Sequence, residues 1–258
     1  DCHVNSYVDT SLKSFKSFLK LSIILVLRTI FKFRIIVHNT ESKKLIKKSI
    51  YCPSPFPKLN NCIKHKVSNK KKIFIISSLN KDEPINEFID AAKTLSLNGI
   101  DVSISGNFNK LSNDYVDKGG DFFTGFLSKD EYIEKINDSS LVIAMTKRSY
   151  NLLFAPREAL LYRRKCLINN SKENKNFYGS LCFYSDIDAK SISDNALMIL
   201  DDETFIIDQT KIDELYGNIE LQITELQKCF SIKNTVTIDL LVVIILGITL
   251  YMMKKYIL

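Results

Sequence analysis

The chain has 258 residues, a formal net charge of +7 and six cysteines. No aromatic-interleaved basic stretch accompanies the charge, so we exclude nucleic acid as a partner and favour anionic membrane surfaces and phosphorylated small molecules. The cysteines form no C-x-x-C pair and show no metal-ligand spacing, which indicates a reducing compartment and no metal site.

We expect residues 1–60 to form the C-terminal part of a domain, since 60 residues are too few for a whole domain of typical size. They contain a helical stretch, a strand at 33–39, a second helix and a proline-rich crossing from Cys52 to Pro57. The Lys-rich run that follows predicts a solvated linker over 61–71.

Residues 72–210 alternate strands and helices in the manner of a doubly wound, Rossmann-like parallel sheet, so the predicted fold class is α/β. Strands are predicted at 71–77, 100–106, 121–126, 141–145, 165–169 and 180–185, with a loop between the last two. Helices are predicted from Ile85 to Leu95, after the capping box Ser128–Glu131 with Tyr132, Ile133 and Ile136 turned inward, from Pro156, near 188–200 and at 211–230.

The most informative stretch is the buried strand at 141–145 with the basic loop and helix that follow it. Thr146, Lys147 and Arg148 provide a hydroxyl and two cations, and Pro156 suits the first helical position because its missing N–H costs nothing there. Free N–H groups at the helix start would favour a phosphate at this carboxyl end of the sheet. The alternative is an ordinary strand-loop-helix joint with solvated cations, and spacing alone does not separate the two.

Several motifs also occur in a characteristic order along the chain. They are SSLNKDEP (77–84), a helix ending in Ala91-Ala92, ISGN (104–107), FFTGFLSKDEY (122–132) and MTKRSYNLLFAPREAL (145–160). Over roughly residues 1–230 this set resembles GT-B glycosyltransferases, in particular the bacterial family-4 type of polysaccharide assembly. The resemblance implies two Rossmann-like domains, a nucleotide-sugar donor bound between them, and sugar transfer with retention of configuration, without a metal or cofactor.

The resemblance also implies site residues. Glu158 matches the glutamate that accepts hydrogen bonds from the donor's ribose, and Arg148 and Lys81 fall where the family places cations against the diphosphate. Such cations stabilise the departing nucleoside diphosphate. His3, in Asp1-Cys2-His3, resembles an acceptor-side D-x-H element; the alternative is a surface histidine. The other expected donor-binding residues are Ser78, Gly106, Asn107, Gly125, Phe126, Thr146, Lys147, Leu153 and Arg157.

The sequence departs from the family pattern near this site. Tyr150 stands where many family members have a first glutamate, and Phe154 to Arg157 replace the usual small residues before Glu158. Arg157 supplies a compensating charge in this interpretation. The alternative role for Glu158 is that of a helix-start carboxylate favoured by the dipole.

The two ends of the chain carry further expectations. An enzyme of this type needs on the order of 100 more residues before Asp1, which indicates a fragment, a processed product or a split enzyme with a separate N-terminal subunit. The apolar segment 235–253 predicts a C-terminal hydrophobic helix that anchors the chain on the cytoplasmic side of a membrane; a core helix or an interfacial segment is the alternative.

The expected reaction is therefore sugar transfer from a nucleotide sugar to a lipid-linked or polysaccharide acceptor. The alternative is a catalytically inactive nucleotide-sugar-binding or scaffold subunit. A nucleotide-dependent oxidoreductase is disfavoured because no G-x-G-x-x-G follows the strand at 71–77 or the one at 100–106.

Overall fold

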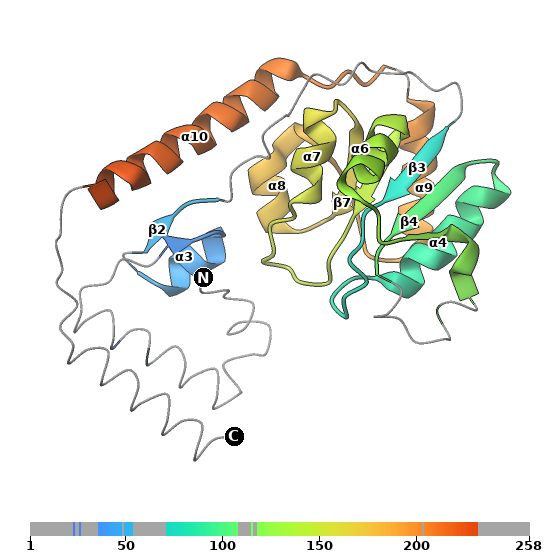
Figure 1. Cartoon of the computed structure of the whole chain (residues 1–258), viewed down its shortest axis with the longest axis horizontal. Coiled ribbons are helices and arrows are strands. Elements are labelled where there is room, and N and C mark those ends of the chain that lie inside the picture. The colour runs from blue at the N-terminus through green and yellow to red at the C-terminus, as the bar shows by residue number, and fades with distance from the viewer. Residues whose placement is uncertain are drawn as a thin grey trace, which may run out of the picture. The chain divides into compact units, whose positions relative to one another are not determined.

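The fold is built around a six-stranded parallel sheet (Figure 1). The structure is a computed structural model, and it describes residues 36–47, 49–53, 71–107, 118–202 and 204–231 and the single positions 23, 26 and 115. The strands are β3 (Lys72–Ile75), β4 (Asp101–Ser105), β5 (Phe123–Gly125), β6 (Leu141–Ala144), β7 (Lys165–Asn169) and β8 (Phe183–Ser185). Their spatial order is β5-β4-β3-β6-β7-β8, and every neighbouring pair is parallel.

The strand order reverses direction between β3 and β6. The first strand of this sheet along the chain, β3, lies in its middle. Strands β4 and β5 follow on one side of β3, and β6, β7 and β8 follow on the other. In open α/β sheets, ligands bind outside the carboxyl ends of the strands at such a reversal. The loops after β3 and β6 are therefore the first place to look for a site.

Helices cover both faces of the sheet (Figure 1). Residues of α4 (Ile85–Leu97) and α9 (Ala189–Asp201) form one core with the strands, and residues of α6 (Lys129–Asp138), α7 (Ala155–Leu161) and α8 (Lys172–Tyr178) form the other. Alternate strand residues serve the two cores, because successive side chains of a strand point to opposite faces. Ile73 and Ile75 lie in the first core and Phe74 in the second.

Shorter elements complete the described part of the chain. Strands β1 (Ile36–Val37) and β2 (Ile50–Tyr51) pair in parallel, with α3 (Thr40–Leu45) between them. Two 3-10 turns are η2 (Gly120–Phe122) and η3 (Gly179–Leu181). Helix α10 (Gln209–Ser231) crosses the boundary between two compact units, which falls after Glu220.

Most of the predicted elements are confirmed. All six predicted strands of the sheet are present, and the capping box at the start of α6 forms as expected, with Ser128 and Glu131 bonded reciprocally. Helix α4 buries the apolar face read from its sequence, and α9 and α10 match the two later helical predictions.

Four expectations were wrong in detail. The loop expected between β7 and β8 contains α8, capped by Ser171, whose Oγ accepts from the N–H of Asn174 at 3.2 Å. Strand β2 was not expected. Helix α7 begins at Ala155, so Pro156 is its second residue. Of the three side chains expected to turn inward from α6, only that of Ile136 is fully buried; the other two are half-buried.

Some predictions lie outside the described residues. These are most of the N-terminal helical stretch, the proline-rich crossing after Pro53, the linker from residue 61 to residue 70, His3 and the apolar segment at 235–253. Among the residues that are described, no helix combines the length and the apolar character that crossing a bilayer requires.

Candidate functional site

A cavity of about 370 Å³ lies at the carboxyl ends of β3, β4, β5 and β6. Its size falls within the range typical of small-molecule sites. The lining includes several of the predicted donor-site residues: Ser78, Gly106, Asn107, Gly125, Phe126 and Leu153. The remainder comes from the same loops and from α6 and α7: Ile76, Ser77, Glu83, Ser105, Leu127, Tyr132, Ala144, Met145 and Ala155.

Two glycines form the wall at the ends of β4 and β5. Gly106 has φ +145° and donates its N–H to the carbonyl of Gly125 at 3.1 Å; Gly125 has φ +77°. A Cβ on Gly106 would lie 2.3 Å from Cγ of Leu79, so a side chain would collide there. Glycine at both positions therefore lets main chain, rather than side chains, border the cavity.

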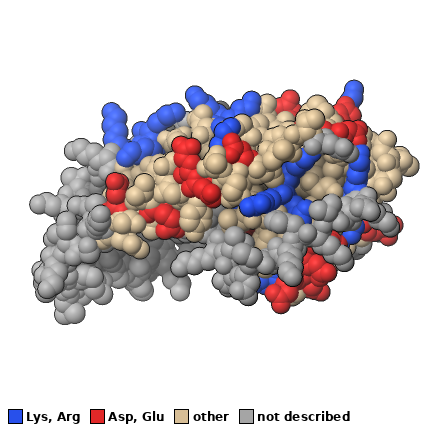
Figure 2. Space-filling view, turned by 90° about the horizontal axis from the view of Figure 1, so that it is seen from above, with Lys and Arg blue, Asp and Glu red and all other residues tan. Residues whose placement is uncertain are grey.

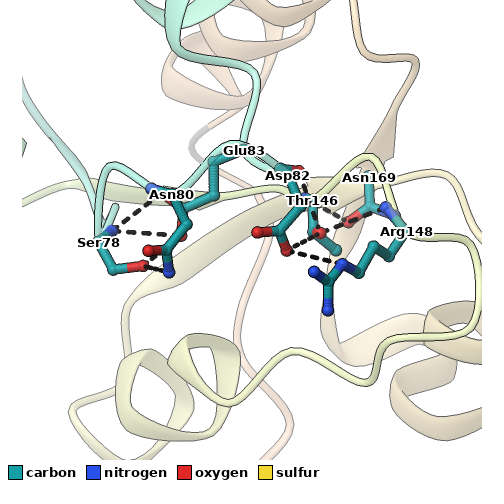
Figure 3. A network of polar contacts seen from close by, with 7 residues as sticks. All are labelled: Ser78, Asn80, Asp82, Glu83, Thr146, Arg148 and Asn169. Carbon is teal, nitrogen blue, oxygen red and sulfur yellow. Dashed lines mark hydrogen bonds and ion pairs between the residues drawn. The ribbon is translucent and has the colours of Figure 1, made fainter. Parts of the chain in front are cut away.

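The loop after β3 holds a carboxylate. Oε2 of Glu83 accepts from Oγ of Ser77 at 2.5 Å. It also accepts from the N–H of Ser78 at 3.0 Å and from the N–H of Asn80 at 3.3 Å, while Oε1 accepts from Oγ of Ser78 at 2.7 Å (Figure 3). Leu79, inside this loop, has φ 56°, a left-handed conformation that costs a non-glycine residue about 1–2 kcal/mol. The bonds to Glu83 fix this strained turn.

Asp82 joins the loop after β3 to the loop after β6. Its carbonyl accepts from the N–H of Lys147 at 2.7 Å. Its Oδ2 accepts from Oγ1 of Thr146 at 3.3 Å (Figure 3). The N–H of Thr146 in turn donates to Oδ1 of Asn169, at the end of β7. Thr146, expected to contact the donor, is buried in this joint.

The predicted cations are paired with carboxylates. Nε of Arg148 lies 3.2 Å from Oδ2 of Asp82, and Nζ of Lys147 lies 3.2 Å from Oε1 of Glu87. Lys81 is exposed, and the described lining of the cavity contains neither a lysine nor an arginine. Part-exposed pairs of this kind contribute only about 0–1 kcal/mol, so a stronger anionic partner can replace the carboxylate of Asp82 or Glu87.

Glu158, the residue with the strongest functional prediction, adjoins the cavity through Tyr132. The Tyr132 hydroxyl donates to Oε2 of Glu158 at 2.6 Å, and Tyr132 itself lines the cavity. Burial raises the pKa of Glu158, although the hydrogen bond from Tyr132 lowers it in part. Burial also raises the pKa of Tyr132, and the neighbouring carboxylate adds to this rise. Keeping Glu158 ionised at this position therefore costs free energy of desolvation.

Arg157 lies elsewhere. It is 1% exposed, and its guanidinium carbon is 5.4 Å from the ring centre of Phe154 and 4.9 Å from that of Phe177. Arg157 is not among the described residues that line the cavity. The guanidinium of Arg157 therefore lies where α7 packs against α8.

A buried carboxylate away from the cavity lining, Glu173 on α8, was not predicted. It accepts from the N–H and from Oγ1 of Thr40 at 2.9 and 2.5 Å. Burial raises the pKa of Tyr51 to about 12, with a further contribution from Glu173 that Arg157 opposes. These contacts join the β1–α3 segment to α8.

Another cavity, of about 280 Å³, lies at the amino-terminal ends of β3 and β4. Its lining mixes charges of both signs, including Lys72, Asp101, Glu134, Lys135 and Asp138. Because Lys72 and Asp138 are paired at 2.9 Å and ligands of open α/β sheets bind at the opposite end, we assign the site to the first cavity.

No metal cluster is evident where the chain is described, and the face drawn in Figure 2 is not uniformly basic. No group of three His, Cys, Asp or Glu side chains there is arranged to hold a metal. Cys52, Cys166 and Cys182 are buried free thiols, and burial raises the pKa of Cys52 and Cys182. On the face in Figure 2, basic and acidic side chains are interspersed.

Known proteins match this chain through their structures rather than their sequences. No family model and no curated protein matches. A glycosyltransferase from Rickettsia africae aligns with a TM-score of 0.63 at 13% identity, covering 78% of this chain and 64% of that one. The structure of TarM aligns at 0.60 and 17% identity, covering 83% and 46%, and a sucrose-phosphate synthase from Thermosynechococcus elongatus at 0.58 and 12%, covering 76% and 57%.

The chain thus spans less than two thirds of each of these structures. Likeness at such low identity concerns the fold, and in this respect the resemblance read from the sequence is confirmed: the described part of the chain has the fold of GT-B glycosyltransferases.

Proposed function

We propose that this chain carries the donor-binding half of a glycosyltransferase, which transfers a sugar from a nucleotide sugar to a lipid-linked or polysaccharide acceptor. The supporting observation is the cavity at the point where the strand order reverses, with Glu158 held beside it by Tyr132. The matched glycosyltransferase structures support sugar transfer as the reaction class.

The cavity suits the parts of a nucleoside. Its outer wall is apolar, with Phe126 85% exposed at the rim, and the main chain at Gly106 and Gly125 leaves room for a flat base. Glu158 would accept hydrogen bonds from the ribose hydroxyls. A carboxylate that is already desolvated gives stronger hydrogen bonds than one in water, because the local dielectric is lower.

Arg148, Lys147 and Lys81 would provide the positive charge for the leaving diphosphate. Arg148 would have to exchange Asp82 for phosphate, which the low strength of a part-exposed ion pair permits. In this proposal, fixed cations stabilise the departing group without a metal, and the sugar is transferred with retention of configuration.

The acceptor side of the proposal depends on residues outside the described part of the chain. We propose that acceptor contacts come from His3 and from a further domain or separate subunit. The apolar segment 235–253 would anchor the chain at the cytoplasmic side of a membrane, beside a lipid-linked acceptor.

Calorimetric titration of the intact chain with nucleotide sugars of different bases tests the proposal. We expect one base to bind at micromolar to millimolar concentration, and binding to weaken at least tenfold in Glu158→Ala and in Arg148→Ala. Asp90→Asn is the control: it removes one exposed charge on α4, outside the cavity lining. If no nucleotide sugar binds to the intact chain, the proposal is wrong.

A second candidate function, binding without turnover, is favoured by one observation. The described lining of the cavity contains the carboxylate of Glu83 and no cation, which is unfavourable for a diphosphate leaving group. Donor hydrolysis measured with the intact chain separates the two functions: saturable release of nucleoside diphosphate supports the enzyme, whereas donor binding without release supports the non-catalytic role.

A further inference from the structure

We propose that Glu83 determines the ligand specificity of the cavity, because its carboxylate occupies the anion position beside the loop after β3 and selects against a phosphate there. This inference rests on the proposed function for the class of ligand, a nucleoside derivative. It adds a residue that disfavours the charged part of that ligand.

The hydrogen bonds of the loop are the first argument. Carboxylate and phosphate oxygens are acceptors of the same kind, and both bind to clusters of N–H and O–H donors. In this loop, the main-chain N–H groups of Ser78 and Asn80 and the hydroxyl of Ser78 donate to Glu83 (Figure 3). The hydroxyl of Ser77 donates to it as well. A phosphate at the same place would have to displace the carboxylate from these donors.

Charge is the second argument. Among the described residues Glu83 makes no ion pair, and the nearest basic loop has its two cations engaged with Asp82 and Glu87. The described lining of the cavity offers Glu83 as its one carboxylate, with no lysine or arginine to offset it. A second anion placed beside this uncompensated charge would be repelled.

The third argument is that the carboxylate is positioned by the chain itself. Ser77 lies directly after the central strand, and its Oγ also accepts from the N–H of Leu79 at 3.0 Å, so the turn and the carboxylate form one network. The rigid strand end keeps the negative charge at the cavity wall. At this point the wall therefore favours a neutral group, such as a base or a sugar, over a phosphate, and the diphosphate of the proposed donor would lie on the side of Arg148 and Lys147.

The experiment compares the intact chain with Glu83→Gln, which keeps the shape and one acceptor but removes the charge. Titrations use three probes: inorganic pyrophosphate, a nucleoside, and the corresponding nucleoside diphosphate. For the intact chain we expect the diphosphate to bind no more than about tenfold better than the nucleoside. For Glu83→Gln we expect the affinity for pyrophosphate and for the diphosphate to rise on the order of tenfold or more, with nucleoside affinity unchanged.

The control is Asp90→Asn, which removes the same charge from an exposed position on α4 and should leave all three affinities unchanged. A merely structural role for Glu83 would lower the affinity for all three probes together. If Glu83→Gln does not fold, the neutral variant Glu83→Ser is measured instead. The ratio of the affinities of the intact chain for the diphosphate and for the nucleoside also tests the inference without any variant.

The outcomes separate this inference from the proposed function. A diphosphate that binds the intact chain far better than its nucleoside, or affinities unchanged in Glu83→Gln, would overturn the role of Glu83 alone. Failure of every nucleoside and nucleotide to bind, combined with a gain in pyrophosphate affinity in Glu83→Gln, would overturn the proposed function and support the anion position. No binding of any probe to either chain would overturn both.

Discussion

Tyr132 and Glu158 form a 2.6 Å hydrogen bond between α6 and α7, with the phenol as donor. The two residues are 26 positions apart in sequence, yet the parallel sheet brings their helices together beside the same cavity. Glu158 is half-buried, and a carboxylate that is partly removed from water costs free energy in a folded protein. Carboxylates perturbed in this way are frequent at functional sites.

Replacing Glu158 with glutamine should stabilise the protein at neutral pH. Burial raises the pKa of Glu158, so the folded chain holds the proton more tightly than the unfolded chain. The resulting cost is absent below the unfolded pKa of about 4.3, grows as the pH rises through the folded pKa, and is complete above it. Glutamine has no such cost and still accepts from Tyr132.

The measurement is the free energy of unfolding in urea from pH 4 to pH 8. The advantage of Glu158→Gln over the native chain should grow with pH. The control, Glu131→Gln, should behave in the opposite way, because the hydrogen bond from Ser128 lowers the pKa of Glu131. Equal pH profiles for the native chain and Glu158→Gln would contradict the burial of this carboxylate.

Removing the hydroxyl of Tyr132 should destabilise the chain. Tyr132→Phe deletes a hydrogen bond to a charged acceptor, for which we expect a loss of about 1.5–3 kcal/mol. The pKa of Glu158 should rise further, since that hydrogen bond lowers it. Tyr184→Phe is the matched control: its hydroxyl donates at 2.7 Å to the neutral carbonyl of Gly179, so its loss should be smaller. Equal losses in the two variants would argue against an ionised Glu158.

Adding a methyl group at Gly106 should distort the cavity wall. The new Cβ would meet the side chain of Leu79 and would require an alanine at φ +145°. We expect Gly106→Ala to lower the free energy of unfolding by about 1–3 kcal/mol and to weaken nucleotide binding. Gly217→Ala, where no atom lies within 4 Å of the new Cβ, provides the control. A Gly106→Ala chain of native stability would contradict the close approach of Leu79.

Truncating Glu173 should loosen the attachment of the β1–α3 segment. Its carboxylate accepts two hydrogen bonds from Thr40 and is 3% exposed. We expect Glu173→Ala to cost about 2–3 kcal/mol and to increase proteolytic cleavage near Thr40. Thr40→Ala, which keeps the N–H donor, should have about half that effect. An unchanged cleavage pattern in Glu173→Ala would show that this contact does not hold the segment.

Patterns in the sequence predicted the sheet because its strands are short apolar runs with clear stop signals. Leu141 to Ala144 are buried on both faces, as such runs are in parallel sheets. Helix α8 was missed because its sequence, KENKNFY, has no apolar face; it buries Glu173, Asn174 and Tyr178, and two of these are polar. Polar burial of this kind depends on partners distant in the chain.

Several residues predicted for a donor site line one cavity, but their partners were not predicted. The glycines at the ends of β4 and β5 and two residues of the segment before Glu158, Leu153 and Ala155, lie together in its lining. The partners of Arg148 and Glu158 lie 66 and 26 residues away, and no local pattern specifies them. The hydrogen bonds of Glu83 to its own loop were also not predicted, since an acidic residue before a helix is equally typical of an ordinary helix start.

The contact between Glu158 and the ribose of the ligand is the central claim, and one comparison tests it most directly. Calorimetry would measure the affinity of a nucleoside and of its 2′,3′-dideoxy analogue for the intact chain and for Glu158→Ala. We predict that the intact chain prefers the ribose form by roughly tenfold or more, the effect of a hydrogen bond to a charged group, and that Glu158→Ala loses this preference. The same preference in both chains, or no preference in the intact chain, would contradict the account.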